Sequence, residues 1–181
     1  IINGRIRGVA GVVGCNNART RHNEAHIAVV KELIKNDVIV LTTGCNGIAY
    51  AMEGLLTPEA AAVHCGPGLA EVCETVGIPP VLHMGSCVDN SRLLLAATEV
   101  VKAGGLGKDI CDLPLAGSAP EWMSEKAISI GQYFVSSGVY TVFGLYLPTS
   151  GAPVFHDYLS KEMEKIYGGK WDLEADPIKH A

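Results

Sequence analysis

Positive charge, long apolar runs and a secretion signal are all scarce or missing in this chain. Lys and Arg number 14 against 19 Asp and Glu, which gives a net charge of −5, and no basic run stands out. This balance argues against a nucleic-acid-binding surface or an anionic-membrane partner. No apolar stretch reaches the roughly 18 to 20 residues of a membrane span, and the N-terminus lacks a signal-peptide pattern. We therefore expect a cytoplasmic protein.

Close cysteine pairs are also lacking. The 6 cysteines are spread over 181 residues, and none forms the C-x-x-C pair that is common in structural zinc sites. A disulfide scaffold is a poor interpretation as well, because such scaffolds are short and dense in cysteine. Widely spaced cysteines in a reducing compartment favour metal binding or catalysis.

The chain also lacks a dinucleotide-binding fingerprint and an initial methionine. The glycines of "GVAGVVG", residues 8–14, have the wrong spacing for a dinucleotide fingerprint, and no acidic residue ends the second predicted strand. The chain also begins at Ile1 instead of Met. We expect residues 1–181 to form one domain, as a fragment or processed subunit of a larger protein.

The chain does have a regular alternation of apolar runs of strand length with segments of helical period. This order predicts parallel strands joined by crossover helices, hence an α/β fold: three α/β/α layers around a doubly wound, mostly parallel sheet. The predicted strands are 6–14, 38–43, 80–84, 113–117, 140–145 and 171–174, and the predicted helices are 23–35, 46–55, 58–76, 91–103, 120–137 and 153–167.

Cysteine follows the first three predicted strands at equivalent places. Cys15, Cys45 and Cys87 each stand near a glycine and just beyond an apolar run. Because parallel strands end at the same edge, right-handed crossovers would bring these thiols to one rim. Glycine there lets the backbone approach sulfur, an arrangement common at iron–sulfur clusters. We expect Cys65, Cys73 and Cys111 to be buried and inert instead.

Four motifs in order carry a family resemblance. They are "GVVGCNN", "TTGCNGIA", "LHMGSCVDNSR" and "GSAPEWMSEKAISIG". Together they resemble the C-terminal Rossmann-like domain of the anaerobic nickel–iron–sulfur carbon monoxide dehydrogenases, relatives of the hybrid-cluster proteins. The resemblance implies oxidation of CO with water to CO2, two protons and two electrons at a Ni–Fe–S centre, the C-cluster.

The resemblance also implies residue roles. Cys15 and Cys45 correspond to iron ligands of the cluster, and Cys87 corresponds to the thiolate on nickel. Lys126 is similar to the family's lysine that donates a hydrogen bond to a CO2 oxygen. Ile130 is similar to the apolar residue that crowds the open nickel position. Soft thiolates suit such metals, and a lysine beside a dry cluster would stabilise a developing carboxylate.

The rest of the family's centre has no counterpart in this chain. A histidine, two further cysteines and the electron-transfer clusters would come from the remaining domains of the parent enzyme. The resemblance implies a homodimer when complete and a ferredoxin-type electron acceptor, and we expect the isolated chain to be inactive. We interpret His83 as a hydrogen-bonded core residue. The histidines that do not match the family's ligand motif are His22, His26, His64, His83, His156 and His180.

Two other functions stay open. The chain could be a stand-alone iron–sulfur or zinc scaffold that completes a centre with another subunit. It could also be a thiol-dependent enzyme in which Cys87, at a strand-to-helix turn, is the nucleophile.

Overall fold

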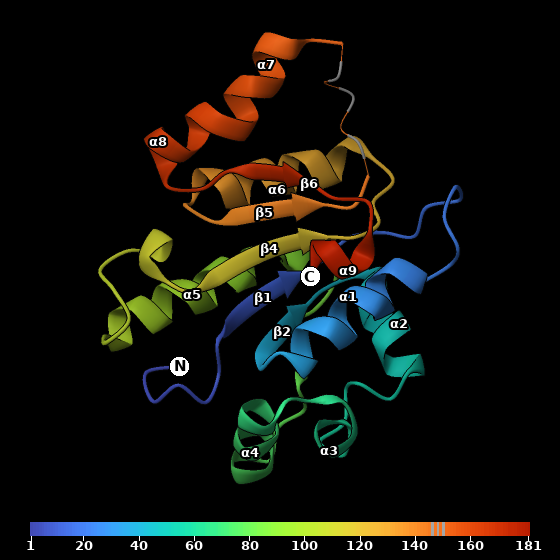
Figure 1. Cartoon of the computed structure of the whole chain (residues 1–181), viewed down its shortest axis with the longest axis vertical. Coiled ribbons are helices and arrows are strands. Elements are labelled where there is room, and N and C mark those ends of the chain that lie inside the picture. Colours follow the sequence, from blue (N-terminus) through green and yellow to red (C-terminus); the bar gives the residue numbers. More distant parts are fainter. Residues whose placement is uncertain (146, 148, 150) are drawn as a thin grey trace.

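The strands form one parallel sheet. The structure, a computed structural model, describes residues 1–145, 147, 149 and 151–181. These residues form a six-stranded sheet in the order β3-β2-β1-β4-β5-β6, and each neighbouring pair is parallel (Figure 1). The expected α/β fold is confirmed. The strands are β1 (Gly8–Val12), β2 (Val38–Thr42), β3 (Val81–His83), β4 (Leu115–Ala119), β5 (Tyr140–Phe143) and β6 (Trp171–Leu173).

Helices cover both faces of the sheet. In Figure 1, α1 and α9 lie in front of the strands and α5 lies behind them. Consecutive residues at the end of β1 alternate accordingly: Val12, its last residue, packs in the core that includes α1, whereas Val13, the next residue, packs with α5 and α6. The helices are α1 (Glu24–Lys35), α2 (Cys45–Met52), α3 (Ala60–His64), α4 (Pro67–Val76), α5 (Ser91–Ala103), α6 (Glu125–Ser136), α7 (Pro153–Asp157), α8 (Met163–Tyr167) and α9 (Pro177–His180). Short 3₁₀ turns cover Cys87–Asp89 (η1) and Ile110–Asp112 (η2), and a π-turn, Tyr158–Glu162 (η3), joins α7 to α8.

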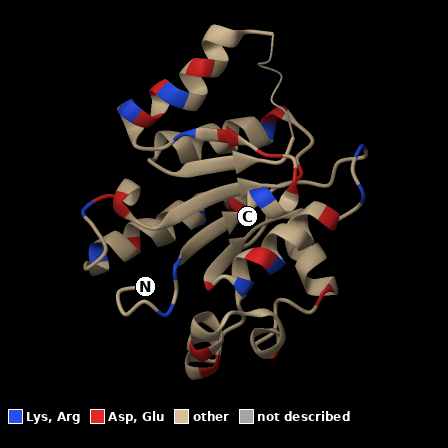
Figure 2. Cartoon of the chain, viewed as in Figure 1, with Lys and Arg blue, Asp and Glu red and all other residues tan. Residues whose placement is uncertain are grey.

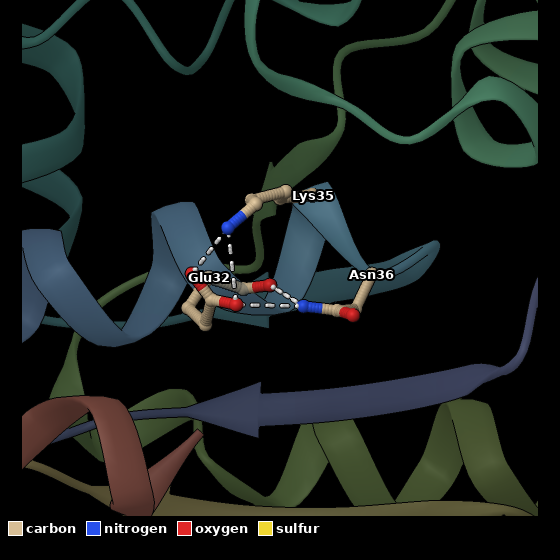
Figure 3. A network of polar contacts seen from close by, with 3 residues as sticks. All are labelled: Glu32, Lys35 and Asn36. Carbon is tan, nitrogen blue, oxygen red and sulfur yellow. Dashed lines mark hydrogen bonds and ion pairs between the residues drawn. The ribbon is translucent and has the colours of Figure 1, made fainter.

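Polar contacts close the end of α1. Lys35 lies 3.2 Å from Glu32, and the Asn36 amide donates to both the carbonyl and the carboxylate of Glu32 (Figure 3). Hydrogen bonds from Lys35 and Asn36 lower the pKa of the Glu32 carboxyl. The next residue, Asp37, has a φ of 61° and accepts a 2.8 Å bond from the Leu69 N–H of α4. The contacts thus end α1 and turn the chain into β2.

The predicted helix 58–76 is two helices, which corrects the sequence interpretation. Gly66 is extended, with φ −66° and ψ 165°, because a residue before proline avoids the helical region. A side chain at Gly66 would also lie only 2.6 Å from the Lys35 carbonyl oxygen. The break lets α4 start at Pro67.

The predicted helix 120–137 begins later, at Glu125. Pro120 lies in the turn after β4, where its carbonyl packs against Gly144 so closely that no side chain would fit there. Residues 120–124 form a loop that carries Glu121 into the interior, where it is 0% exposed. Ser124 precedes the helix with extended backbone.

The predicted burial of the other three cysteines and of His83 is confirmed for some of these residues and wrong for others. Cys73 is buried as expected, and Cys65 is half-buried. Cys111 is exposed, contrary to expectation, because it lies on the short turn η2; a side-chain carbon added at Gly138 or Gly168 would lie 2.8 or 2.9 Å from its Cβ. His83 is also exposed instead of buried, since it ends edge strand β3 and its ring rests against Gly47.

Opposite charges are mixed along the surface helices. Figure 2 shows basic and acidic residues interspersed along the helical segment from α7 through η3 to α8. Lys161 lies 2.8 Å from Asp157, and Lys165 lies 2.9 Å from Glu162. Such exposed pairs are strongly screened by water and salt. In the part of the chain that the structure describes, no helix is both long and apolar enough to cross a membrane.

Candidate functional site

Cys15, Cys45 and Cys87 follow the carboxyl ends of β1, β2 and β3. These strands are neighbours in the sheet, and the direction of chain winding reverses between β1 and β4. In doubly wound sheets the crevice at such a reversal is where ligands bind. The fold therefore carries all three thiols to the edge that favours a binding site.

The Cys45 and Cys87 segments touch through glycine. The Gly44 N–H donates to the Gly85 carbonyl at 3.0 Å. A side-chain carbon added to Gly44 would lie 3.1 Å from Cβ of Cys87, and Gly44 has a φ of 70° that disfavours any other residue. Glycine beside Cys45 thus lets the two cysteine segments approach each other. Both thiols are exposed.

Lys126 joins this rim from the first turn of α6. Its Nζ donates a hydrogen bond to Cys87 Sγ at 2.9 Å, between residues 39 apart in the chain. The hydrogen bond to Cys87 raises the pKa of the Lys126 ammonium, and the charge of Cys87 adds to the effect. The amine therefore stays protonated beside the sulfur.

Cys15 is half-buried and held by the loop after β4. Its N–H donates to the Glu121 carbonyl at 2.9 Å. Burial raises the pKa of the Cys15 thiol, Cys45 and Cys87 raise it further, and the Met123 N–H and Lys126 lower it. Cys45, Cys87 and Lys126 are thus close enough to Cys15 to act on its charge.

A small apolar cavity opens beside the sulfur atoms. It has a volume of about 100 Å³ and includes Cys15, Cys87, Lys126 and Ile130 in its wall. The rest of the wall is mainly apolar or glycine, with Val13, Phe134 and Phe143 among it. Cys45 is not part of this wall. Four of the five residues singled out from the sequence therefore border one cavity, and the fifth, Cys45, follows the neighbouring strand β2.

A buried polar layer beneath the rim was not anticipated. His26 and Asn46 are 0% exposed and hydrogen-bonded to each other, at 3.0 Å between Nδ1 and Nδ2. The Glu121 carboxylate accepts a 3.0 Å bond from the Thr20 hydroxyl. Burial lowers the pKa of His26. The shared "GCN" in two of the motifs was a signal for Asn46, but His26 left none.

The thiols do not form a compact mononuclear site. Among residues 1–145, 147, 149 and 151–181, no three His, Cys, Asp or Glu side chains converge closely enough to hold one metal ion. A structural zinc ion needs four close ligands. The arrangement instead suits a larger group that several sulfur atoms hold from different sides.

Comparison with known proteins matches nearly the whole chain. The Prismane/CO dehydrogenase family matches residues 1–178. Carbon monoxide dehydrogenase 1 of Methanosarcina mazei is 56% identical over 181 residues, which is 100% of this chain and 28% of that protein. Carbon monoxide dehydrogenase 1 of Carboxydothermus hydrogenoformans is 42% identical, with 98% of this chain and 29% of that protein covered.

A solved structure agrees with this match. The Ni-free crystal structure of carbon monoxide dehydrogenase from Thermococcus sp. AM4 superimposes with a TM-score of 0.93 at 54% identity, covering 98% of this chain and 28% of that chain. The chain thus spans less than a third of its relatives' length. On the family match over nearly its whole length, this chain belongs to the Prismane/CO dehydrogenase family.

Proposed function

We propose that this chain is the part of a nickel–iron–sulfur carbon monoxide dehydrogenase that completes the active centre with Cys15, Cys45 and Cys87. The reaction converts CO and water to CO2, two protons and two electrons. The observation that carries the proposal is the hydrogen bond from Lys126 to Cys87 Sγ, 2.9 Å long. It puts a protonated amine beside the thiol that we propose holds nickel, at the edge of a mainly apolar cavity.

The donor set fits a nickel–iron–sulfur group. The three thiols come from separate strand ends, and no three ligands of the described chain converge on a single ion. Sulfur ligands suit iron–sulfur and nickel chemistry. Cys15 and Cys45 would hold irons, and Cys87 would hold nickel. When bound, the group supplies the site for CO and accepts the two electrons.

Lys126 and Ile130 would act on the substrate side. The Lys126 ammonium keeps its proton at Nζ, since the Cys87 sulfur raises its pKa. It can therefore donate a hydrogen bond to a carboxylate oxygen that forms beside Cys87 and stabilise its charge. Ile130 borders the same cavity with mainly apolar neighbours, which keeps the space small.

Other parts of the enzyme would supply what these residues lack. The missing cluster ligands and the electron-transfer clusters would come from the remaining domains, and electrons would pass to a ferredoxin-type acceptor. We further propose a homodimer of the complete enzyme, working in the cytoplasm under anaerobic conditions. Residues 1–181 would be one domain of it.

Metal and activity measurements on the complete protein test this function. Anaerobically purified enzyme should contain iron and nickel and should reduce a viologen dye only when CO is present. Metal-replete protein without CO-dependent dye reduction would contradict the proposed reaction, and protein free of both metals would contradict the proposed centre.

A thiol-dependent reaction at Cys87 is the second candidate. The observation in its favour is that the exposed Cys87 starts the turn η1 with Lys126 beside its sulfur. Alkylation separates the two functions. If Cys87 alone is modified in the metal-replete enzyme, its sulfur is free and the second function is favoured. If metal protects Cys87, the sulfur is a ligand.

A further inference from the structure

The three cysteine segments are joined to neighbouring loops in different ways. Backbone bonds link the turns after β2 and β3, from Gly44 N–H to the Gly85 carbonyl at 3.0 Å. A backbone bond also links the loops after β1 and β4, from Cys15 N–H to the Glu121 carbonyl at 2.9 Å. Between β1 and β2 the paired register ends at Val12 and Thr42, before either cysteine. The segments that carry Cys15 and Cys45 must therefore be connected in another way.

The side chain of His26 crosses this gap. Its Nε2 lies 2.8 Å from the carbonyl oxygen of Cys15, and its Nδ1 lies 3.0 Å from Nδ2 of Asn46. Asn46 directly follows Cys45 in the first turn of α2. The ring therefore connects the backbone of one proposed ligand with the residue next to another.

The chemistry of the partners allows one arrangement of protons. A carbonyl oxygen only accepts, so Nε2 of His26 carries the proton and donates to Cys15. The Nδ2 of Asn46 only donates, so Nδ1 of His26 accepts. With the Asn46 amide reversed, its oxygen would face Nδ1, and a neutral ring already donating through Nε2 has no second proton to offer. In this orientation Asn46 Nδ2 also donates to the Tyr50 hydroxyl at 3.4 Å, whereas the buried Oδ1 of Asn46 has no hydrogen-bond partner among the described residues.

Rigid packing holds the bridge. His26, Asn46 and Tyr50 are all 0% exposed, so water cannot replace a broken bond without a rearrangement. Gly14 lies against the ring: a side-chain carbon there would be 3.2 Å from Cε1 of His26. An aromatic ring bonded at both ends has little freedom, and it transmits the position of α2 to the Cys15 backbone.

We propose that His26, with Asn46, is a positioning residue that sets the separation of Cys15 and Cys45 for metal binding. The inference rests on the proposed function, because it gives these cysteines the role of cluster ligands. Hydrogen-bonded partners that orient metal ligands typically change metal affinity or activity by about 10- to 100-fold when mutated. His26 touches no proposed metal or substrate, so its effect would pass through the two cysteine segments.

The test uses the complete enzyme, purified anaerobically, with His26→Leu and Asn46→Ala as the variants that break the bridge at either end. The readouts are iron and nickel per protein and the electron paramagnetic resonance (EPR) spectrum of the centre. We expect both variants to lose nickel and to alter the spectrum, with about a 10- to 100-fold loss of activity. The double variant should be no worse than the worse single variant, because both break one link.

Rescue and a matched control separate positioning from stability. Gln carries one donor and one acceptor, as the neutral imidazole does, so His26→Gln should recover part of the metal content and the spectrum. His180→Leu removes another buried histidine whose two hydrogen bonds, to Ser118 and to the Glu174 carbonyl, reach none of the three cysteine segments. It should lower the unfolding temperature but leave metal and spectrum unchanged.

The outcomes are distinguishable. Wild-type metal and spectrum in both bridge variants, with only a lower unfolding temperature as in His180→Leu, would overturn the positioning role and leave the proposed function intact. If His26→Leu does not fold, Asn46→Ala decides between the same outcomes. Wild-type enzyme without iron and nickel would overturn the proposed function, and this inference with it.

Discussion

Lys126 on α6 and Cys87 after β3 meet at 2.9 Å, so the two halves of the sheet are joined by a hydrogen bond from an ammonium to a sulfur atom. β3 is at one edge of the sheet, and α6 lies between β4 and β5 on the other side of the chain reversal. The bond therefore spans the crevice in which the substrate would react.

Replacing Lys126 should affect turnover and leave the metals in place. In the complete enzyme Lys126→Ala removes a donor but no ligand, so iron and nickel content should stay at the wild-type level. Turnover should fall by about 100-fold or more, the scale for one preorganised donor. Lys102→Ala is the control, because Lys102 is exposed and pairs with Glu99 on α5. Metal loss in Lys126→Ala would contradict the assigned role.

Gly44→Ala should disturb Cys87. The new Cβ would lie 3.1 Å from the Cys87 Cβ, at a φ of 70°. Gly54→Ala is a matched control, because Gly54 has a φ of 71° but nothing within 4 Å. Both variants should lose about 1 kcal/mol or more of stability from backbone strain. Only Gly44→Ala should lose nickel as well, as measured by elemental analysis. Equal nickel content in the two variants would show that the close approach of Gly44 to Cys87 does not matter for metal binding.

Acid should destabilise the chain through His180. Burial lowers the pKa of His180 from its ordinary 6.5, and the hydrogen bond that its ring donates to the Glu174 carbonyl only partly opposes this shift. As pH falls below 6.5 the unfolded chain binds a proton that the folded chain does not, so the stability present above this pH is progressively lost. Urea unfolding at several pH values should show that the free energy of unfolding depends less steeply on pH in His180→Gln than in the wild-type chain. If the two proteins lose stability equally as the pH falls, protonation of His180 does not cause the loss.

Residues 1–181 expressed alone should fold but not oxidise CO. The sheet is covered on both faces by cores that need no metal. Brief labelling with a maleimide should modify Cys45, Cys87 and Cys111, which are exposed, and spare the buried Cys73. Reconstitution with iron, sulfide and nickel should give no CO-dependent dye reduction. Sustained turnover would mean that the chain needs no other domain.

Sequence patterns predicted those features that depend on chain order. Parallel strands end at one edge, so the order of strands and helices was enough to place Cys15, Cys45 and Cys87 together. Sequence patterns did not predict features that depend on one local backbone or side-chain contact. Gly66 breaks a helix because Pro67 follows it, and Cys111 is exposed because it lies on the short turn η2, not on a longer helix or a strand. His26 reaches Cys15 and Asn46 through its ring, and a bridge of this kind leaves no periodic signal.

Anomalous X-ray scattering from crystals of the complete, anaerobically purified enzyme tests the central claim most directly. Data collected at the iron and nickel edges locate each element separately. We predict iron peaks beside the sulfur atoms of Cys15 and Cys45, and a nickel peak beside that of Cys87, on the side that faces Lys126. Metal-replete crystals with no anomalous peak at these three sulfur atoms would contradict the account.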